Sequence, residues 1–369
     1  MLLCPMPTPP SRIALLGTGL IGGSMGLALH DRAPTVSVVG HDRPDVLERA
    51  AAREAIDAKA ADPQTAVAAA DLVVLATPPA VTLRLLDTIA DALPPDAVVT
   101  DVASIKEPVM DQARDVLPAG VSFVGGHPMA GAEHAGIDHA DALLFENATY
   151  VLCPAATASE AALDTVRWLT ETVGARPLRM EAARHDRIAA AVSHLPQLLA
   201  VALTNTAAAH DDGAMHLAAG GFRDMTRIAA SPFELWRDIL VGNQGYVLDA
   251  LSRFSNQLQR LRSRLAADLM DDIEAAFGQA RAARASIPEG MKGFLTPQHD
   301  LYVQAPDTPG TLHRLTGALS SADLNIKDIE LLKVREGAAG TFRLGFASAA
   351  DAQAARTVLE DAGFSARRP

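Results

Sequence analysis

The sequence Arg12-Ile-Ala-Leu-Leu-Gly17-Thr-Gly19-Leu-Ile-Gly22 near the start of the chain is the main indication of its fold class. A short apolar strand ends at Gly17, and a Gly-x-Gly-x-x-Gly motif leads directly into a helix predicted over residues 20–29. In dinucleotide-binding folds the first glycine makes the turn, and the second lets a pyrophosphate approach the backbone at the helix N-terminus. The third lets the helix pack close to the sheet. Packing alone can also select such glycines, but the position between strand and helix predicts a dinucleotide site.

A carboxylate at the end of the second strand supports this prediction. Asp42 follows the apolar run at residues 35–40 and can accept hydrogen bonds from ribose hydroxyls, which favours NAD. Arg43 beside it could bind a 2′-phosphate, so NADP stays the less favoured alternative. We expect the cofactor to contact the motif, this strand end and the turn after the next central strand, namely Gly17, Gly19, Leu20, Ile21, Gly22, Asp42, Arg43, Thr77 and Pro78.

Further apolar runs at residues 71–76, 98–102 and 121–125 alternate with alanine-rich segments of helical character. Strands that are apolar on both faces and alternate with helices indicate a parallel sheet covered on both sides. The sequence therefore predicts an α/β, doubly wound Rossmann-type domain over residues 11–178.

After residue 180 the pattern becomes helical. Apolar residues recur at helical spacing from Ile188 to Leu203, interrupted only by Pro196. A second series has the 3–4 spacing of a packed seam: Leu251, Phe254, Leu258, Leu261 and Leu265. One helix within residues 245–285 would extend roughly 60 Å at 1.5 Å per residue. Such a seam fits either an intramolecular bundle or, the interpretation we favour, a dimer interface. We expect an all-α helical substrate and dimerisation domain over residues 179–292.

The last part of the chain follows a linker marked by Pro288, Gly290, Gly293 and Pro297. Strand patterns occur at residues 300–305, 326–334, 342–347 and 364–367, and helical patterns at 310–320 and 349–360. This βαββαβ order predicts a ferredoxin-like domain over residues 298–369.

Composition excludes several function classes. The 369 residues carry 44 acidic and 32 basic side chains, and the net charge of −12 argues against a nucleic-acid partner. No uninterrupted apolar run reaches about 18 residues, so no membrane span is predicted. The two cysteines, Cys4 and Cys153, form no Cys-x-x-Cys pair. We therefore expect neither a disulfide framework nor a metal site, and a cytoplasmic location.

Three segments concentrate polar residues in apolar surroundings. The first two follow predicted strands, Asp101-Val-Ala-Ser104-Ile-Lys106 and Gly125-Gly-His127-Pro-Met-Ala-Gly-Ala-Glu133. The third combines Ser193-His194-Leu-Pro196 with Gly220-Gly-Phe-Arg223-Asp224-Met-Thr-Arg227. Each has an ordinary explanation: Ser104 as a helix cap, His194 as a core histidine, Arg227 paired with Asp224 at helical spacing. Their joint occurrence beside a dinucleotide site favours an active site.

These motifs, together with Trp236, resemble the prephenate dehydrogenase family over residues 12–285. The last segment is similar to an ACT domain, with Asp307-x-Pro309-Gly310 before its first helix and Asn325-Ile326 before its second strand. The resemblance implies NAD-dependent oxidative decarboxylation of prephenate to 4-hydroxyphenylpyruvate in tyrosine biosynthesis. It also implies a homodimer, with feedback by an amino acid, most naturally tyrosine, at a site bordered by Gly310 and Asn325. A dimerisation appendage without a ligand stays open for this segment.

The resemblance also assigns roles to the candidate residues. His127 would accept the proton of the C4 hydroxyl, with Ser104 and His194 beside it in the active site. Arg227 would bind the ring carboxylate. Arg223 stands where the family often has lysine and would bind the pyruvyl carboxylate. Glu133 and Asp224 would be gating or orienting acids.

Two other functions remain open at this point. Arogenate dehydrogenase differs only in an amine for the keto group of the substrate, and no side chain announces an ammonium partner. A non-catalytic protein that senses NAD and an amino acid is the alternative from another class. A sensor has no evident need for the set Ser104, His127, His194 and Arg227.

Overall fold

The computed structural model describes residues 9–131, 135–211, 213–286, 299–306, 308–333 and 340–368. The chain divides into two compact units, Met1–Arg281 and Ala282–Pro369.

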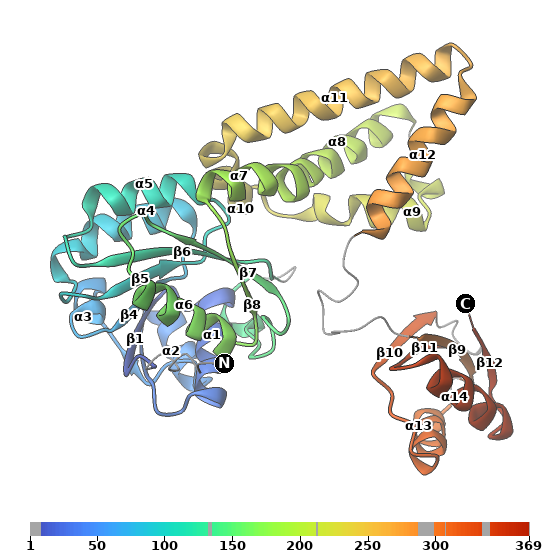
Figure 1. Ribbon diagram of the computed structural model, residues 1–369, viewed down its shortest axis with the longest axis horizontal. Coiled ribbons are helices and arrows are strands. Elements are labelled where there is room, and N and C mark those ends of the chain that lie inside the picture. Colours follow the sequence, from blue (N-terminus) through green and yellow to red (C-terminus); the bar gives the residue numbers. More distant parts are fainter. Residues whose placement is uncertain are drawn as a thin grey trace, which may run out of the picture. The chain divides into compact units, whose positions relative to one another are not determined.

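The first unit contains an eight-stranded sheet of order β3-β2-β1-β4-β5-β6-β7-β8 (Figure 1). Its strands are β1 (Arg12–Leu16), β2 (Ser37–His41), β3 (Ala58–Lys59), β4 (Leu72–Leu75), β5 (Val98–Asp101), β6 (Ser122–Pro128), β7 (Thr149–Pro154) and β8 (Arg176–Arg179). The first six strands have the 3-2-1-4-5-6 order of dinucleotide-binding folds. The sheet edge at their carboxyl ends is therefore where a ligand is expected.

The five strands predicted from the sequence pair in parallel, whereas β7, which the sequence patterns did not predict, runs antiparallel to β6. Parallel neighbours need a crossover, usually a helix. In its described part, the connection from β6 to β7 holds only the short 3₁₀ turn η2 (Ile137–His139). The chain therefore returns beside β6 in the opposite direction.

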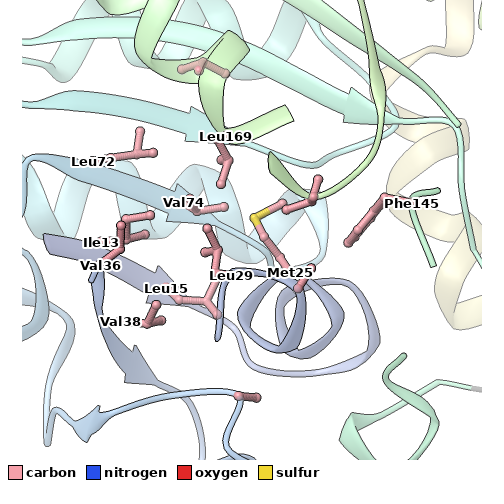
Figure 2. Close-up of a cluster of buried hydrophobic side chains, with 14 of the residues drawn as sticks. Ile13, Leu15, Met25, Leu29, Val36, Val38, Leu72, Val74, Phe145 and Leu169 are labelled. Carbon is pink, nitrogen blue, oxygen red and sulfur yellow. The ribbon is translucent and has the colours of Figure 1, made fainter. Parts of the chain in front are cut away.

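Helices cover both faces of the sheet, as predicted. Ile13 and Leu15 of β1 pack on one face with α1 (Leu20–Arg32), α2 (Pro44–Ala52) and α6 (Glu160–Thr172). Figure 2 shows part of this core, with Met25 and Leu29 of α1 beside the strands. Ala14 and Leu16 face the other layer, made by α3 (Pro63–Val67), α4 (Pro79–Ile89) and α5 (Glu107–Val116), with the short η1 (Ala90–Ala92) after α4. Side chains that alternate along one strand thus supply both cores.

The second part of this unit is helical. A continuous helix contains α7 (Ala182–Ala189), the π-helical turn η3 (Ala190–His194) and α8 (Leu195–His210). Pro196 has no N–H to donate, and the wider π turn lies just before it. The remaining elements are η4 (Ala214–Leu217), α9 (Gly220–Thr226), η5 (Arg227–Ala230), α10 (Phe233–Gly242), α11 (Gln244–Ala266) and α12 (Met270–Ala285).

One helix among the described residues, Ala182–His210, is long and apolar enough to cross a membrane. Length and composition are the only grounds for this, and the core helices of proteins outside membranes pass the same test.

The predicted single helix over residues 245–285 is wrong, because α11 ends at Ala266 and α12 begins at Met270. Asp268 between them has a left-handed backbone with φ of +54°, which a continuing α-helix cannot accommodate. The seam residues Phe254, Leu258, Leu261 and Leu265 are exposed in the single chain. Figure 1 shows α8 and α11 running beside each other.

The second unit has the predicted βαββαβ order. It consists of β9 (His299–Ala305), α13 (Thr311–Ser321), β10 (Asp328–Lys333), β11 (Gly340–Phe346), α14 (Ala349–Asp361) and β12 (Ser365–Arg367). The sheet is antiparallel, with the order β10-β11-β9-β12. One face packs on the two helices through Leu301, Val303, Leu315 and Phe346.

Candidate active site

The glycine turn has the local geometry that a pyrophosphate requires. Gly17 adopts φ of +97°, and a Cβ there would collide with the carbonyl oxygen of Ala76. A Cβ at Gly22 would collide with the carbonyl oxygen of Gly17, so this glycine lets α1 approach the turn. At Gly19 no described atom lies within 4 Å of an added Cβ. The open space at the N-terminus of α1 fits a phosphate group.

The other predicted cofactor residues surround this turn or flank it. Asp42 accepts hydrogen bonds from the N–H groups of Thr18 and Arg43, both at 2.7 Å, so its carboxylate joins the turn to the end of β2. Arg43 is exposed at the N-cap of α2. The remaining members are Leu20 and Ile21 in the first turn of α1, Thr77 at 2.9 Å from the Thr82 hydroxyl, and Pro78 at the N-cap of α4.

His127 lies in β6 and is the first member of a buried hydrogen-bonded chain. Its Nδ1 is 2.7 Å from Nε2 of His185, whose Nδ1 is 2.7 Å from the Asp186 carboxylate. This carboxylate also accepts from the N–H groups of Lys106 and Glu107, at 2.7 and 2.8 Å. Asp186 therefore caps the N-terminus of α5, where its negative charge is favoured.

The chain of hydrogen bonds fixes the protons of both rings. A carboxylate only accepts, so Nδ1 of His185 carries a proton, and an uncharged His185 ring then has its lone pair on Nε2. Nδ1 of His127 must then donate to His185, which leaves a lone pair on Nε2 of His127. Burial is the main cause that lowers the pKa of His127 well below its ordinary value, and the charge of Lys106 lowers it further. His127 is therefore a neutral ring whose free lone pair is on Nε2.

A second buried pair holds the backbone just before His127. Lys106 forms an ion pair with Asp101, and both side chains are fully buried. Lys106 Nζ donates to the Gly126 carbonyl at 2.6 Å, and Asp101 accepts from the Gly126 N–H at 3.0 Å. Because β5 ends at Asp101, this pair satisfies the polar groups of Gly126 that have no strand partner on that side.

His194 ends the π turn and belongs to the same cluster. Its Nδ1 is 3.1 Å from Nδ2 of Asn243, which also donates to the Asp186 carbonyl at 2.9 Å. The Trp236 ring meets His194 edge to face, with ring centroids 6.0 Å apart. Burial lowers the pKa of His194 to about 4. Both predicted histidines are thus neutral and linked through Asp186.

The structure places the other predicted residues as follows. Ser104 is half-buried in the loop between β5 and α5. Its interpretation as a helix cap is wrong, because Lys106 is the N-cap residue and Asp186 binds the free N–H groups. Arg223, Asp224 and Arg227 are exposed on α9 and η5. Within the described part of the chain, no hydrogen bond joins Arg223 or Asp224 to the histidines. Glu133 lies outside the described residues.

In the second unit, Gly310 has a left-handed backbone with φ of +83° and lines a cavity of about 420 Å³ at the N-terminus of α13. Asn325 is exposed just before β10 and does not line this cavity. Asp307 of the ACT-like motif lies outside the described residues.

Sequence reasoning missed three members of the histidine cluster: His185, Asp186 and Asn243. The adjacent histidine and aspartate, on the helix that also carries His194, were an available signal. No sequence signal pointed to Asn243, because it is a single amide residue between α10 and α11 and belongs to no motif. Across the ranges that the structure describes, no group of three or more His, Cys, Asp or Glu side chains could hold a metal ion.

Comparison with known proteins agrees with this geometry. The chain matches the nucleotide-binding domain of prephenate dehydrogenase over residues 25–178 and its dimerization domain over residues 181–279. It is 34% identical to a prephenate dehydrogenase of Bacillus subtilis (strain 168), covering 94% of this chain and 95% of the relative.

Two solved structures are also similar. The prephenate dehydrogenase of Aquifex aeolicus, in complex with hydroxyphenyl propionate and NAD⁺, has a TM-score of 0.70 at 27% identity, covering 75% of this chain and 98% of that one. The arogenate dehydrogenase of Synechocystis has a TM-score of 0.68 at 31% identity, covering 75% and 100%. The chain therefore belongs to the prephenate dehydrogenase family of NAD-dependent oxidoreductases.

Proposed function

We propose that the substrate is prephenate, which is oxidised and decarboxylated to 4-hydroxyphenylpyruvate with His127 as the base. The observation that carries this proposal is the chain His127–His185–Asp186, which leaves the lone pair of a neutral, buried histidine on Nε2. His127 lies at the carboxyl end of β6, on the sheet edge that also carries the glycine turn after β1. A base is therefore placed on the same edge as the dinucleotide site.

The reaction needs few groups from the protein. The C4 hydrogen leaves as hydride, the C4 hydroxyl gives up its proton, and the ring carboxylate leaves as CO₂ while its bonding electrons make the ring aromatic. NAD⁺, when bound, supplies the hydride acceptor. His127 takes the hydroxyl proton at Nε2 and returns it to the phenolate oxygen, so no net proton is released. His185 and Asp186 stabilise the imidazolium that forms between these two steps.

The remaining roles follow the family resemblance. We infer that Ser104 contacts the C4 hydroxyl and the nicotinamide, and that His194 binds substrate. Arg227 binds the ring carboxylate bidentately, Arg223 binds the pyruvyl carboxylate, and Glu133 and Asp224 orient or gate. The cofactor residues are the glycine turn with Asp42, and Arg43, Thr77 and Pro78 at its edge. NAD is preferred to NADP because both Asp42 oxygens bind backbone N–H groups, which holds the carboxylate at the turn.

We also propose a cytoplasmic homodimer of three-domain chains, divided at residues 11–178, 179–292 and 298–369. The exposed seam of α11 supports the dimer. The βαββαβ unit supports an ACT-like regulatory domain that binds tyrosine, and the cavity beside Gly310 is large enough for an amino acid. Arogenate dehydrogenase is the second candidate function, favoured by the similarity to the Synechocystis enzyme.

One assay tests these assignments. NADH or NADPH formation is followed with prephenate or arogenate, NAD⁺ or NADP⁺, with and without tyrosine. We expect turnover of prephenate with NAD⁺, inhibition by tyrosine, and turnover reduced at least a hundredfold in His127→Ala with NAD⁺ affinity preserved. Faster turnover of arogenate would establish the second candidate, and undiminished turnover in His127→Ala would exclude His127 as the base.

A further inference from the structure

The side-chain amide of Asn243 has its orientation fixed by two partners. Its Nδ2 lies 2.9 Å from the backbone carbonyl oxygen of Asp186, and a carbonyl oxygen only accepts. The nitrogen, and not the oxygen, of the amide must therefore face this carbonyl. The same nitrogen lies 3.1 Å from Nδ1 of His194, so its second hydrogen points to that ring. Asn243 is 3% exposed, which leaves solvent little access to these bonds.

The orientation of Asn243 determines where His194 carries its proton. Nδ1 accepts a hydrogen bond, so the neutral ring must have its hydrogen on Nε2. Burial is the main cause of the low pKa of His194. The Asp186 carboxylate opposes this effect in part by raising the pKa of His194. His194 is 1% exposed, and its Nε2 is buried without a hydrogen-bond partner among the residues that the structure describes. A buried donor of this kind needs an acceptor.

We propose that Asn243 is a positioning residue that sets the tautomer of His194, so that Nε2–H donates to a carboxylate or keto oxygen of the substrate. The substrate part rests on the proposed function. The two histidines then have opposite tautomers, because His127 accepts at Nε2 while His194 donates at Nε2. Asp186 links them: its carboxylate orients His185, and its carbonyl orients Asn243. The site thus holds one acceptor and one donor, both without charge.

Nitrogen NMR of the full-length protein labelled with ¹⁵N at histidine tests the tautomer directly. In the unchanged protein at neutral pH we expect a His194 spectrum with hydrogen on Nε2 and a bare, hydrogen-bonded Nδ1, assigned by loss of the signals in His194→Gln. In Asn243→Asp the carboxylate can only accept, so hydrogen should appear on Nδ1. Hydrogen on Nδ1 in the unchanged protein would overturn the proposal. This readout needs no substrate and no folded variant at position 243, so it is independent of the proposed function.

A double-mutant cycle tests the consequence for binding. Asn243→Ala should raise the KM for prephenate about tenfold, the loss of one neutral hydrogen bond, and change kcat and the KM for NAD⁺ less. In His194→Gln a side-chain amide replaces the ring, so Asn243→Ala should have no further effect on KM there. An equal rise of KM in both backgrounds would show that Asn243 acts independently of His194 and would overturn the proposal.

Discussion

The two parts of the first unit differ in how they bury their apolar side chains. The nucleotide-binding part has large cores on both faces of its sheet. In the helical part, the described residues form one such cluster, and its buried members are only Ala190, Val247 and Ala250. Large side chains there stay exposed, with Leu217 at 87%, Val241 at 74% and Phe277 at 73%. The nucleotide-binding part thus buries its apolar side chains within one chain. The helical part leaves an extensive apolar surface exposed, as is typical of an interface.

The largest expected effect comes from charging that surface. Leu258→Glu with Leu261→Glu would place carboxylates in the seam of α11, and we expect the dimer to dissociate. Sedimentation velocity should show the mass of one chain in place of two. Asn256→Glu is the matched control, because Asn256 lies on the same exposed helix but away from the seam. An unchanged dimer in the double variant would mean that another surface mediates assembly.

The next largest effect is expected from a buried ion pair in the nucleotide-binding part. Lys106→Met removes one member of a fully buried ion pair and leaves Asp101 charged and unpaired. We expect the free energy of unfolding in urea to fall by about 3 kcal/mol. Adding Asp101→Asn should restore part of that loss. Lys59→Met breaks the exposed ion pair with Glu48 and should cost at most about 1 kcal/mol. Equal losses in the two single variants would contradict the structural role of Lys106.

The smallest expected effect is on the pH dependence of stability, through His194 of the helical part. His194 has a pKa of about 4 in the folded chain against an ordinary 6.5. Between these values the unfolded chain binds a proton that the folded chain does not, so stability falls as the pH is lowered through this window. The slope is at most about 1.4 kcal/mol per pH unit for each such histidine. His194→Asn should lose less stability than the unchanged chain between pH 6.5 and 4.5, measured by urea unfolding. Identical slopes would show that His194 is not buried as a neutral ring. Part of the slope should persist in the variant, because the pKa of His127 is also lowered.

Local patterns predicted the parts of this molecule that depend on local geometry. The glycines of residues 17–22 are required by collisions within one turn, and the histidines of residues 127 and 194 stand in recognisable motifs. The antiparallel β7 and the break at Asp268 had no comparable signal. Asp268 has a left-handed backbone, which aspartate adopts less often than glycine, and no glycine or proline nearby predicted the helix break.

The residues that orient the two histidines could not be predicted either, because their contacts join segments far apart in the sequence. The bond between His127 and His185 joins residues 58 positions apart. Asp186 stands among charged neighbours, Arg184 and Arg187, and the pattern there is that of a solvated helix start. Its contact with the N-terminus of α5 exists only once the two parts of the unit pack together. No periodicity within one segment can encode such a contact.

The π turn before Pro196 has a consequence for the angular positions of the two histidines on their helix. At 3.6 residues per turn, residues nine apart such as His185 and His194 would lie roughly 180° apart, on opposite sides of a regular α-helix. One π turn has the effect of an inserted residue, so the remaining rotation between them is closer to roughly 80°. This wider turn allows one helix to direct both rings to the cluster around Asp186. The irregular backbone of residues 190–194 is thus part of the proposed active site, although none of its peptide groups needs to touch the substrate.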